Sequence, residues 1–152
     1  MLELSSPSFA DGGAIPDRFA KEGGNVLPAF DWHGAPEGTE SYALIVEDPD
    51  APKGIVRHLA IAELGPEMRG LNEGQPLDEF TVCRNVFGDA GWGGPRPPAG
   101  DAPHHYHFRL LALDVPTLPV ATGDPAVDLV HAVEGHVVDE AEIVGLYQAR
   151  GG

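Results

Sequence analysis

The stretch Ser41-Tyr42-Ala43-Leu44-Ile45-Val46-Glu47 runs directly into Asp48-Pro49-Asp50-Ala51-Pro52, and this junction of strand and turn decides the fold. The first seven residues favour β structure and are mostly apolar, which is typical of a strand buried on both faces. Two prolines in the turn fix the backbone and end the strand. We therefore predict a central strand over 41–47 that ends in two carboxylates held in defined directions.

A second strand is predicted after the turn, from Val56 to Leu64. Side chains alternate between the two faces of a strand, so strict alternation places His58 on the face opposite to Leu59 and Ile61. A further short strand is predicted over Cys83–Phe87. Together with the central strand, these segments favour an antiparallel sheet joined by tight turns.

A long loop, Gly88–Pro103, leads into a third predicted strand, His104–Leu113. The loop is rich in proline and glycine and contains a single tryptophan. A loop of about this length inside a small domain is usually functional when it is ordered. In the strand that follows, alternation puts His104 and Tyr106 on one face.

The remaining segments are predicted from the positions of their glycines and prolines. Residues before 41 form short strands and turns, because glycines and prolines separate brief apolar pieces. Ala126–Glu134 and Val137–Gln148 are both predicted to be helical, with a break at Gly135. With 152 residues the chain is long enough for one domain, which we assign to 1–152.

Composition excludes several classes of partner. The formal net charge is -15, and a negative surface repels nucleic acids and anionic lipid sheets. One cysteine allows no intrachain disulfide.

No signal peptide is recognised at the start, and no segment approaches the roughly 20 apolar residues that span a bilayer. A cytoplasmic location without a membrane span is the expectation.

Taken together, the turn and the loop resemble the ordered motifs of phosphatidylethanolamine-binding proteins, and the bacterial, Raf-kinase-inhibitor-like branch is the most similar. The resemblance runs from about residue 9 to about residue 150. It rests on these segments, in chain order: Asp48-Pro49-Asp50-Ala51-Pro52, His58, Gly91-Trp92-Gly93-Gly94-Pro95-Arg96-Pro97-Pro98 and His104-His105-Tyr106.

The resemblance implies a mainly β fold of two antiparallel sheets with Greek-key connections and a C-terminal helix. It also implies a pocket for phosphate-like anions, lined by the matching residues Asp48, Asp50, His58, Pro97, His104 and Tyr106. Backbone N–H groups of the glycine-rich loop can form an anion nest, and Gly94 and Pro95 of this loop are also assigned to the predicted site. His105 stands where the family usually has arginine, and this exchange removes an expected ion pair to the acidic turn.

The predicted pocket would bind an anion through donors. His58, His104 and the Tyr106 hydroxyl can all donate hydrogen bonds. Asp48 adds a negative charge beside the anion, and we interpret it as holding one histidine in orientation and favouring its protonated form. Binding of phosphate or phosphoethanolamine should therefore strengthen as the pH falls through the histidine titration.

Three functions are compared. A binding module for a small anion or phosphorylated ligand, able to act through a protein partner, is favoured. An acid–base hydrolase using Asp48, His58 and His104 is the alternative, although no Gly-x-Ser-x-Gly motif or other nucleophile signature supports it. A metal site is disfavoured, because only His105 and His107 share a face and no metal-ligand spacing is present. No cofactor is expected, and the bacterial branch suggests a homodimer.

Overall fold

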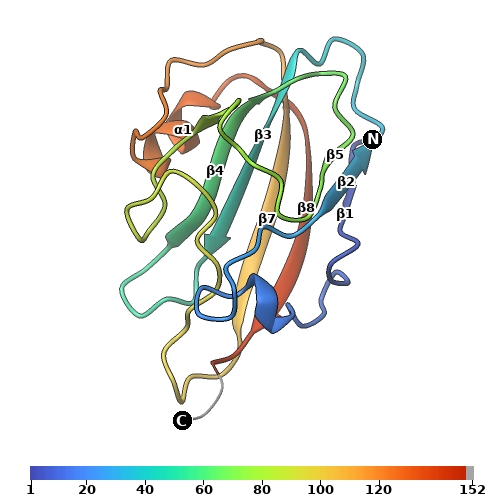
Figure 1. Ribbon diagram of the computed structural model, residues 1–152. Coiled ribbons are helices and arrows are strands. Elements are labelled where there is room, and N and C mark those ends of the chain that lie inside the picture. The colour runs from blue at the N-terminus through green and yellow to red at the C-terminus, as the bar shows by residue number, and fades with distance from the viewer. Residues whose placement is uncertain (150–152) are drawn as a thin grey trace.

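A five-stranded antiparallel sheet forms the centre of the molecule, and a smaller three-stranded sheet lies beside it (Figure 1). The computed structural model describes residues 1–149, so the last three residues of the predicted domain, 150–152, lie outside the described part. The elements are β1 (Glu3–Ser5), the 3-10 turn η1 (Asp17–Phe19), β2 (Phe30–His33), β3 (Ser41–Asp48), β4 (Val56–Leu64), β5 (Gly70–Leu71), β6 (Thr81–Val82), β7 (His104–Leu113), α1 (Ala126–Ala132) and β8 (Val137–Tyr147).

The strand order of the large sheet is β6-β4-β3-β7-β8, and the small sheet has the order β1-β2-β5. Three strands that follow one another in the large sheet, β3, β4 and β6, are neighbours, and β7 returns to pair with β3 on its other side. This arrangement is a Greek key. The predicted class is therefore confirmed: a mainly β fold of two antiparallel sheets with one helix in the C-terminal part.

Strand β3 is buried on both faces, as its sequence predicts. Leu44 and Val46 belong to the core shared with the small sheet, where ring contacts include Phe30 against Phe108. Ala43 and Ile45 belong to a second core, which α1 covers through Leu129 and its neighbours. Two buried faces explain why the strand reads as a continuous apolar run rather than an alternating one.

Two predicted elements are wrong. Residues 137–148 form no helix, because Val137–Tyr147 is strand β8, which pairs with β7 along its whole length. Pairing with a neighbouring strand outweighs the helix propensity of its alanine, leucine and glutamates. The short strand expected over Cys83–Phe87 lies earlier, at Thr81–Val82, and residues 83–87 run on as a bridge and turn.

A β-bulge in β4 overturns the alternation predicted for His58. Val46 pairs with Leu59 and Glu47 with Arg57, so His58 is an extra residue opposite β3. A bulge re-aims the side chain at the inserted position. His58 therefore lies on the same face as Leu59, where its ring contacts the edge of Tyr106 at 5.2 Å between centroids.

Candidate anion-binding site

Three strand ends meet at the end of the large sheet that points downward in Figure 1. There β3 ends at Asp48 and β7 begins at His104, and β4 begins two residues before His58. Because neighbouring strands are antiparallel, the end of one lies beside the start of the next. The site gathers Asp48, His58, His104 and Tyr106, and all four side chains are buried.

His104 lies between two carboxylates. Its Nδ1 is 2.7 Å from Oδ2 of Asp48, and its Nε2 is 3.0 Å from Oδ2 of Asp101. Burial disfavours the charged ring and is the largest single influence on it, but the hydrogen bonds to Asp48 and then Asp101 outweigh burial together and raise the pKa of His104. The predicted role of Asp48, orienting a histidine and favouring its protonated form, matches this geometry.

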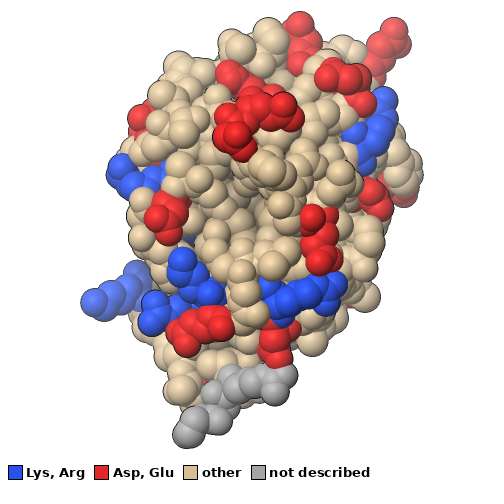
Figure 2. Space-filling view, in the orientation of Figure 1, with Lys and Arg blue, Asp and Glu red and all other residues tan. Residues whose placement is uncertain are grey.

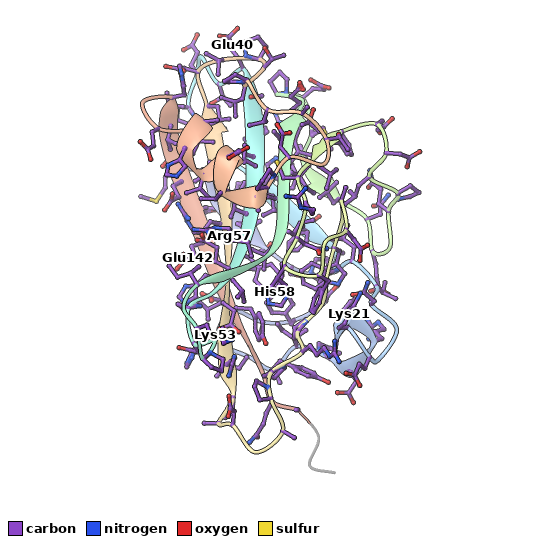
Figure 3. The ribbon with its side chains drawn as sticks, turned by 90° about the vertical axis from the view of Figure 1, so that its left-hand side faces the viewer. Lys21, Glu40, Lys53, Arg57, His58 and Glu142 are labelled. Carbon is purple, nitrogen blue, oxygen red and sulfur yellow. The ribbon has the colours of Figure 1, made fainter. Side chains whose placement is uncertain are left out.

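His58 has the opposite preference. Its Nδ1 donates to the carbonyl oxygen of Gly93 at 2.7 Å, which fixes the tautomer, since a carbonyl can only accept. Burial lowers the pKa of His58, and the Gly93 carbonyl and Asp48 offset this only in part. Figure 3 shows His58 directed into the molecule, whereas Arg57, the residue before it, lies on the other side of the sheet with Glu142.

The Tyr106 hydroxyl is buried, and its O–H finds no acceptor within residues 1–149. Within residues 1–149, only this hydroxyl and Nε1 of Trp32 are buried side-chain polar atoms that form no hydrogen bond. Burial, followed by the carboxylate of Asp48, raises the pKa of Tyr106, and the backbone N–H of Arg96 opposes part of the rise. Its ring is stacked with that of His104, at 6.4 Å between centroids. An unsatisfied buried donor is costly unless it serves a ligand.

Asp50 does not point at these donors. Its Oδ2 accepts from the backbone N–H of His105 at 2.8 Å and lies 2.7 Å from Nδ1 of the same residue. These contacts lower the pKa of Asp50, the side-chain bond more than the backbone one. A side-chain contact to the acidic turn is thus present, because His105 reaches Asp50 in the place of arginine. Asp50 therefore lies at the rim of the site, partly exposed.

The glycine-rich loop supports the site differently from the prediction. The N–H of Gly94 donates to Oδ1 of Asn25 and that of Gly93 to the carbonyl of His58, so neither is available to an anion nest. Pro95 has no N–H, and its carbonyl accepts from Lys21. Gly94 is required for another reason, since a Cβ there would collide with the backbone oxygen of Phe19.

A groove lies beside the buried donors, with a volume of about 360 Å³. Its lining includes the buried Pro97, the exposed Arg96 and the half-buried Tyr147. Tyr147 on β8 is the residue paired with His104 on β7, so the groove reaches the immediate neighbourhood of the histidine. Two acidic side chains also line it: Asp17, which accepts from the Tyr147 hydroxyl, and Glu22, which accepts from Arg96.

Sequence reasoning missed Asp101, which touches His104 more directly than Asp50 does. The available signal was its position: a carboxylate three residues before a site histidine, in a turn where the N–H of Asp101 donates to Pro98. It also missed Asn25, whose amide bonds Trp92 and Gly94 and so holds the loop against the 3-10 turn.

Comparison with known proteins fits this arrangement. The sequence profile described as phosphatidylethanolamine-binding protein matches residues 5–148. The chain belongs to the phosphatidylethanolamine-binding protein family. The resemblance read from the turn, the loop and the third strand is thereby confirmed at the level of the family.

Relatives in this family span nearly the whole chain. A UPF0098 protein of Methanothermobacter thermautotrophicus is 39% identical over 152 residues, which cover 97% of this chain and 99% of that protein. The solved structure of Escherichia coli YbcL, described as a new member of the mammalian PEBP family, superposes with a TM-score of 0.93 at 30% identity, covering 98% of this chain and 99% of that one.

The location of the protein stays a prediction. LppC of Mycobacterium tuberculosis is 35% identical over 147 residues, covering 97% of this chain and 72% of that protein, and its name describes it as a lipoprotein. This family therefore includes a member named for attachment to lipid, and a cytoplasmic location does not follow from membership. Among the described residues, no helix is long and apolar enough to cross a membrane.

Proposed function

We propose that this family member is a binding protein for a small phosphate-like anion, held at His104 and Tyr106. The observation that carries the proposal is the buried Tyr106 hydroxyl, whose O–H has no acceptor within residues 1–149 and whose ring is stacked beside a histidine whose surroundings favour its charge. A phosphate oxygen offers the acceptor that the hydroxyl lacks, and the imidazolium offers the countercharge. The adjacent groove leaves room for the organic part of a phosphate ester.

Tyr106→Phe tests the proposal, since it separates binding from folding. Removing a buried hydroxyl whose proton has no acceptor should change the free energy of unfolding by little, because no hydrogen bond donated by the O–H is lost. Affinity for phosphate or phosphoethanolamine, measured by calorimetry, should fall by roughly tenfold through loss of one hydrogen bond to a charged group. Tyr42→Phe, a buried tyrosine near the other end of β3, is the matched control and should bind like the unsubstituted protein. Equal affinities for the two variants would refute the site.

The pH dependence gives a second test. Sulfate keeps the same charge across the neutral pH range, so any change of its affinity with pH reflects titration of groups on the protein. Affinity should rise as the pH falls from about 8 to about 6 through the raised pKa of His104, because the protonated ring binds the anion better. His104→Gln should bind more weakly and without this pH dependence. A sulfate affinity that is flat with pH in the unsubstituted protein would contradict a histidine-driven site.

Acid–base hydrolysis is the second candidate, and one observation favours it. The pKa of His104 is raised and that of His58 is lowered, and such a divided pair can supply one acid and one base. Turnover of a phosphomonoester, abolished by Asp48→Asn, would support hydrolysis. Binding without turnover would leave the protein a binding module.

A further inference from the structure

Asp101 has a different status from the other groups that touch His104. The Asp48 and His104 side chains are almost fully enclosed, with 4% and 5% of their surface exposed, whereas 41% of the Asp101 side chain faces solvent. Asp101 lies in the turn that follows Gly100, on a stretch where Pro98, Ala99 and Gly100 are exposed. Its carboxylate can therefore leave His104 by side-chain rotation into solvent, while Asp48 cannot.

The contact that Asp101 makes is the one an anionic ligand would need. Carboxylates accept hydrogen bonds, so both ring nitrogens of His104 must carry a proton for both bonds to form. Asp48 uses the Nδ1–H at 2.7 Å, and Asp101 uses the Nε2–H at 3.0 Å. No N–H of His104 is then left for a ligand. The Tyr106 hydroxyl, on the same face of β7, remains unsatisfied beside this closed contact.

We propose that Asp101 is an internal occupant of the anion site, whose carboxylate takes the ligand's position on Nε2 of His104 until an external anion displaces it. This inference rests on the proposed function and adds a rule of selection. A ligand must outcompete a tethered carboxylate, whose effective concentration is high. A simple carboxylate exchanges one equal contact for another and gains nothing. A phosphate or phosphomonoester has further oxygens and can reach the Tyr106 hydroxyl as well as His104.

The test compares Asp101→Ala and Asp101→Asn with the unsubstituted protein. Asp114→Ala is the matched control: Asp114 is another partly exposed aspartate that contacts a histidine, His136, at 3.0 Å, and its removal changes the net charge equally. Inorganic phosphate and acetate are the probes. Calorimetry gives affinity, and the ring resonances of His104 in NMR spectra report whether Nε2 is engaged.

Asp101→Ala should bind phosphate about tenfold more tightly than the unsubstituted protein, as expected when a tethered competitor is removed. Asp101→Asn should be intermediate, because its amide oxygen can still accept from Nε2. Acetate should shift the His104 resonances of Asp101→Ala and leave those of the other proteins unchanged. All titrations are run at a pH where those resonances show His104 protonated in every protein, since Asp48, Asp50, His58 and Tyr106 also surround the ring.

The outcomes separate the two proposals. If the unsubstituted protein binds phosphate and Asp101→Ala binds it equally or more weakly, the internal occupant is wrong and the binding function stands. Weaker binding would make Asp101 a supporting residue that keeps His104 charged. If no protein in the series binds phosphate, both proposals fall together.

Discussion

His58 and His104 lie on one face of the sheet, but their ring nitrogens have different hydrogen-bond acceptors. A carbonyl accepts from His58, and two carboxylates accept from His104. Because the pKa of His58 is lowered on folding, protonation favours the unfolded chain, and stability is lost as the pH falls below the ordinary value. For His104 the sign is reversed: its contribution is present at low pH and is lost as the pH rises through the raised pKa.

Replacing His58 with asparagine should remove the first of these effects. The introduced amide group would stand where the ring Nδ1–H donates to Gly93, and it does not titrate. Between about pH 7 and about pH 5 the unsubstituted protein should lose more free energy of unfolding than His58→Asn, by an amount on the order of 1 kcal/mol. Urea denaturation at both pH values measures the difference. His131→Asn, which replaces an exposed histidine on α1, controls for the loss of one histidine from the chain.

At the rim, His105→Ala should release part of the restraint on Asp50. The pKa of Asp50 should rise toward its usual value but stay below it, because the backbone N–H of residue 105 still donates. Loss of an exposed ion pair should lower the free energy of unfolding by less than about 1 kcal/mol. Carboxyl NMR titration follows the pKa directly. His105→Arg should keep the pKa of Asp50 low, and an unchanged pKa in His105→Ala would deny the pair any role.

At the scale of elements, the glycine-rich loop packs against the end of the 3-10 turn, and this packing positions the loop beside the strand ends. Gly94 approaches the backbone of residues 19–21 so closely that a side chain has no room. The next carbonyl, of Pro95, accepts from Lys21, and the preceding one, of Gly93, holds His58. Gly94 therefore contributes to the site indirectly: it lets the loop approach residues 19–21, and the loop in turn positions the carbonyl that bonds His58.

Gly94→Ala should accordingly destabilise the protein by about 1–3 kcal/mol, the usual range for overpacking. Displacement of the loop should also weaken phosphate binding, since His58 would lose its fixed partner. Gly91→Ala is the control in the same loop, because a Cβ at Gly91 meets nothing within 4 Å. Chemical denaturation and calorimetry on both variants check the prediction. Equal stability for the two alanine variants would contradict the close approach.

Sequence reasoning succeeded where one element determines its own pattern. Burial on both faces made β3 recognisable, and strict alternation identified β7 from His104 onward. It failed where pairing with a neighbouring strand determines the structure. In β8, Ala141, Ile143 and Tyr147 pack inward, as the two-residue repeat of a strand requires. The sequence fits a helix equally well, because Val137, Ala141 and Val144 would form one apolar stripe on a helix. Only pairing with β7 chooses between them.

The same limit explains the errors at the site. The bulge that turns His58 inward is a mismatch between two strands, and no single strand encodes it. The donation of Gly94 to Asn25 joins residues 69 positions apart in the chain. Family resemblance supplied Asp48, His58, His104 and Tyr106, which do meet. It could not supply Asp101, whose role depends on where the loop folds back.

For the whole molecule, the proposed site would have to hold an anion inside a strongly acidic protein. The formal net charge is -15. Lys and Arg gather in the lower half of the face in Figure 2, toward the strand ends, among acidic side chains. Around the groove the basic groups are already paired, Arg18 with Glu73 and Arg96 with Glu22. Within residues 1–149 the surface therefore supplies no free positive patch there, and the proposed attraction for an anion would come from the buried donors.

This charge balance predicts an unusual response to salt. Long-range repulsion by the acidic surface should hinder the approach of a dianion at low ionic strength, and salt screens it beyond about 10 Å at 0.1 M. Affinity for sulfate should therefore rise when the ionic strength is increased from roughly 10 to 100 mM with a salt whose anion is too large for the site. The buried contacts to His104 and Tyr106 are screened far less and should persist. Calorimetry across this range measures the effect, and an affinity that falls with salt, as at an exposed basic patch, would show that surface cations bind the anion instead.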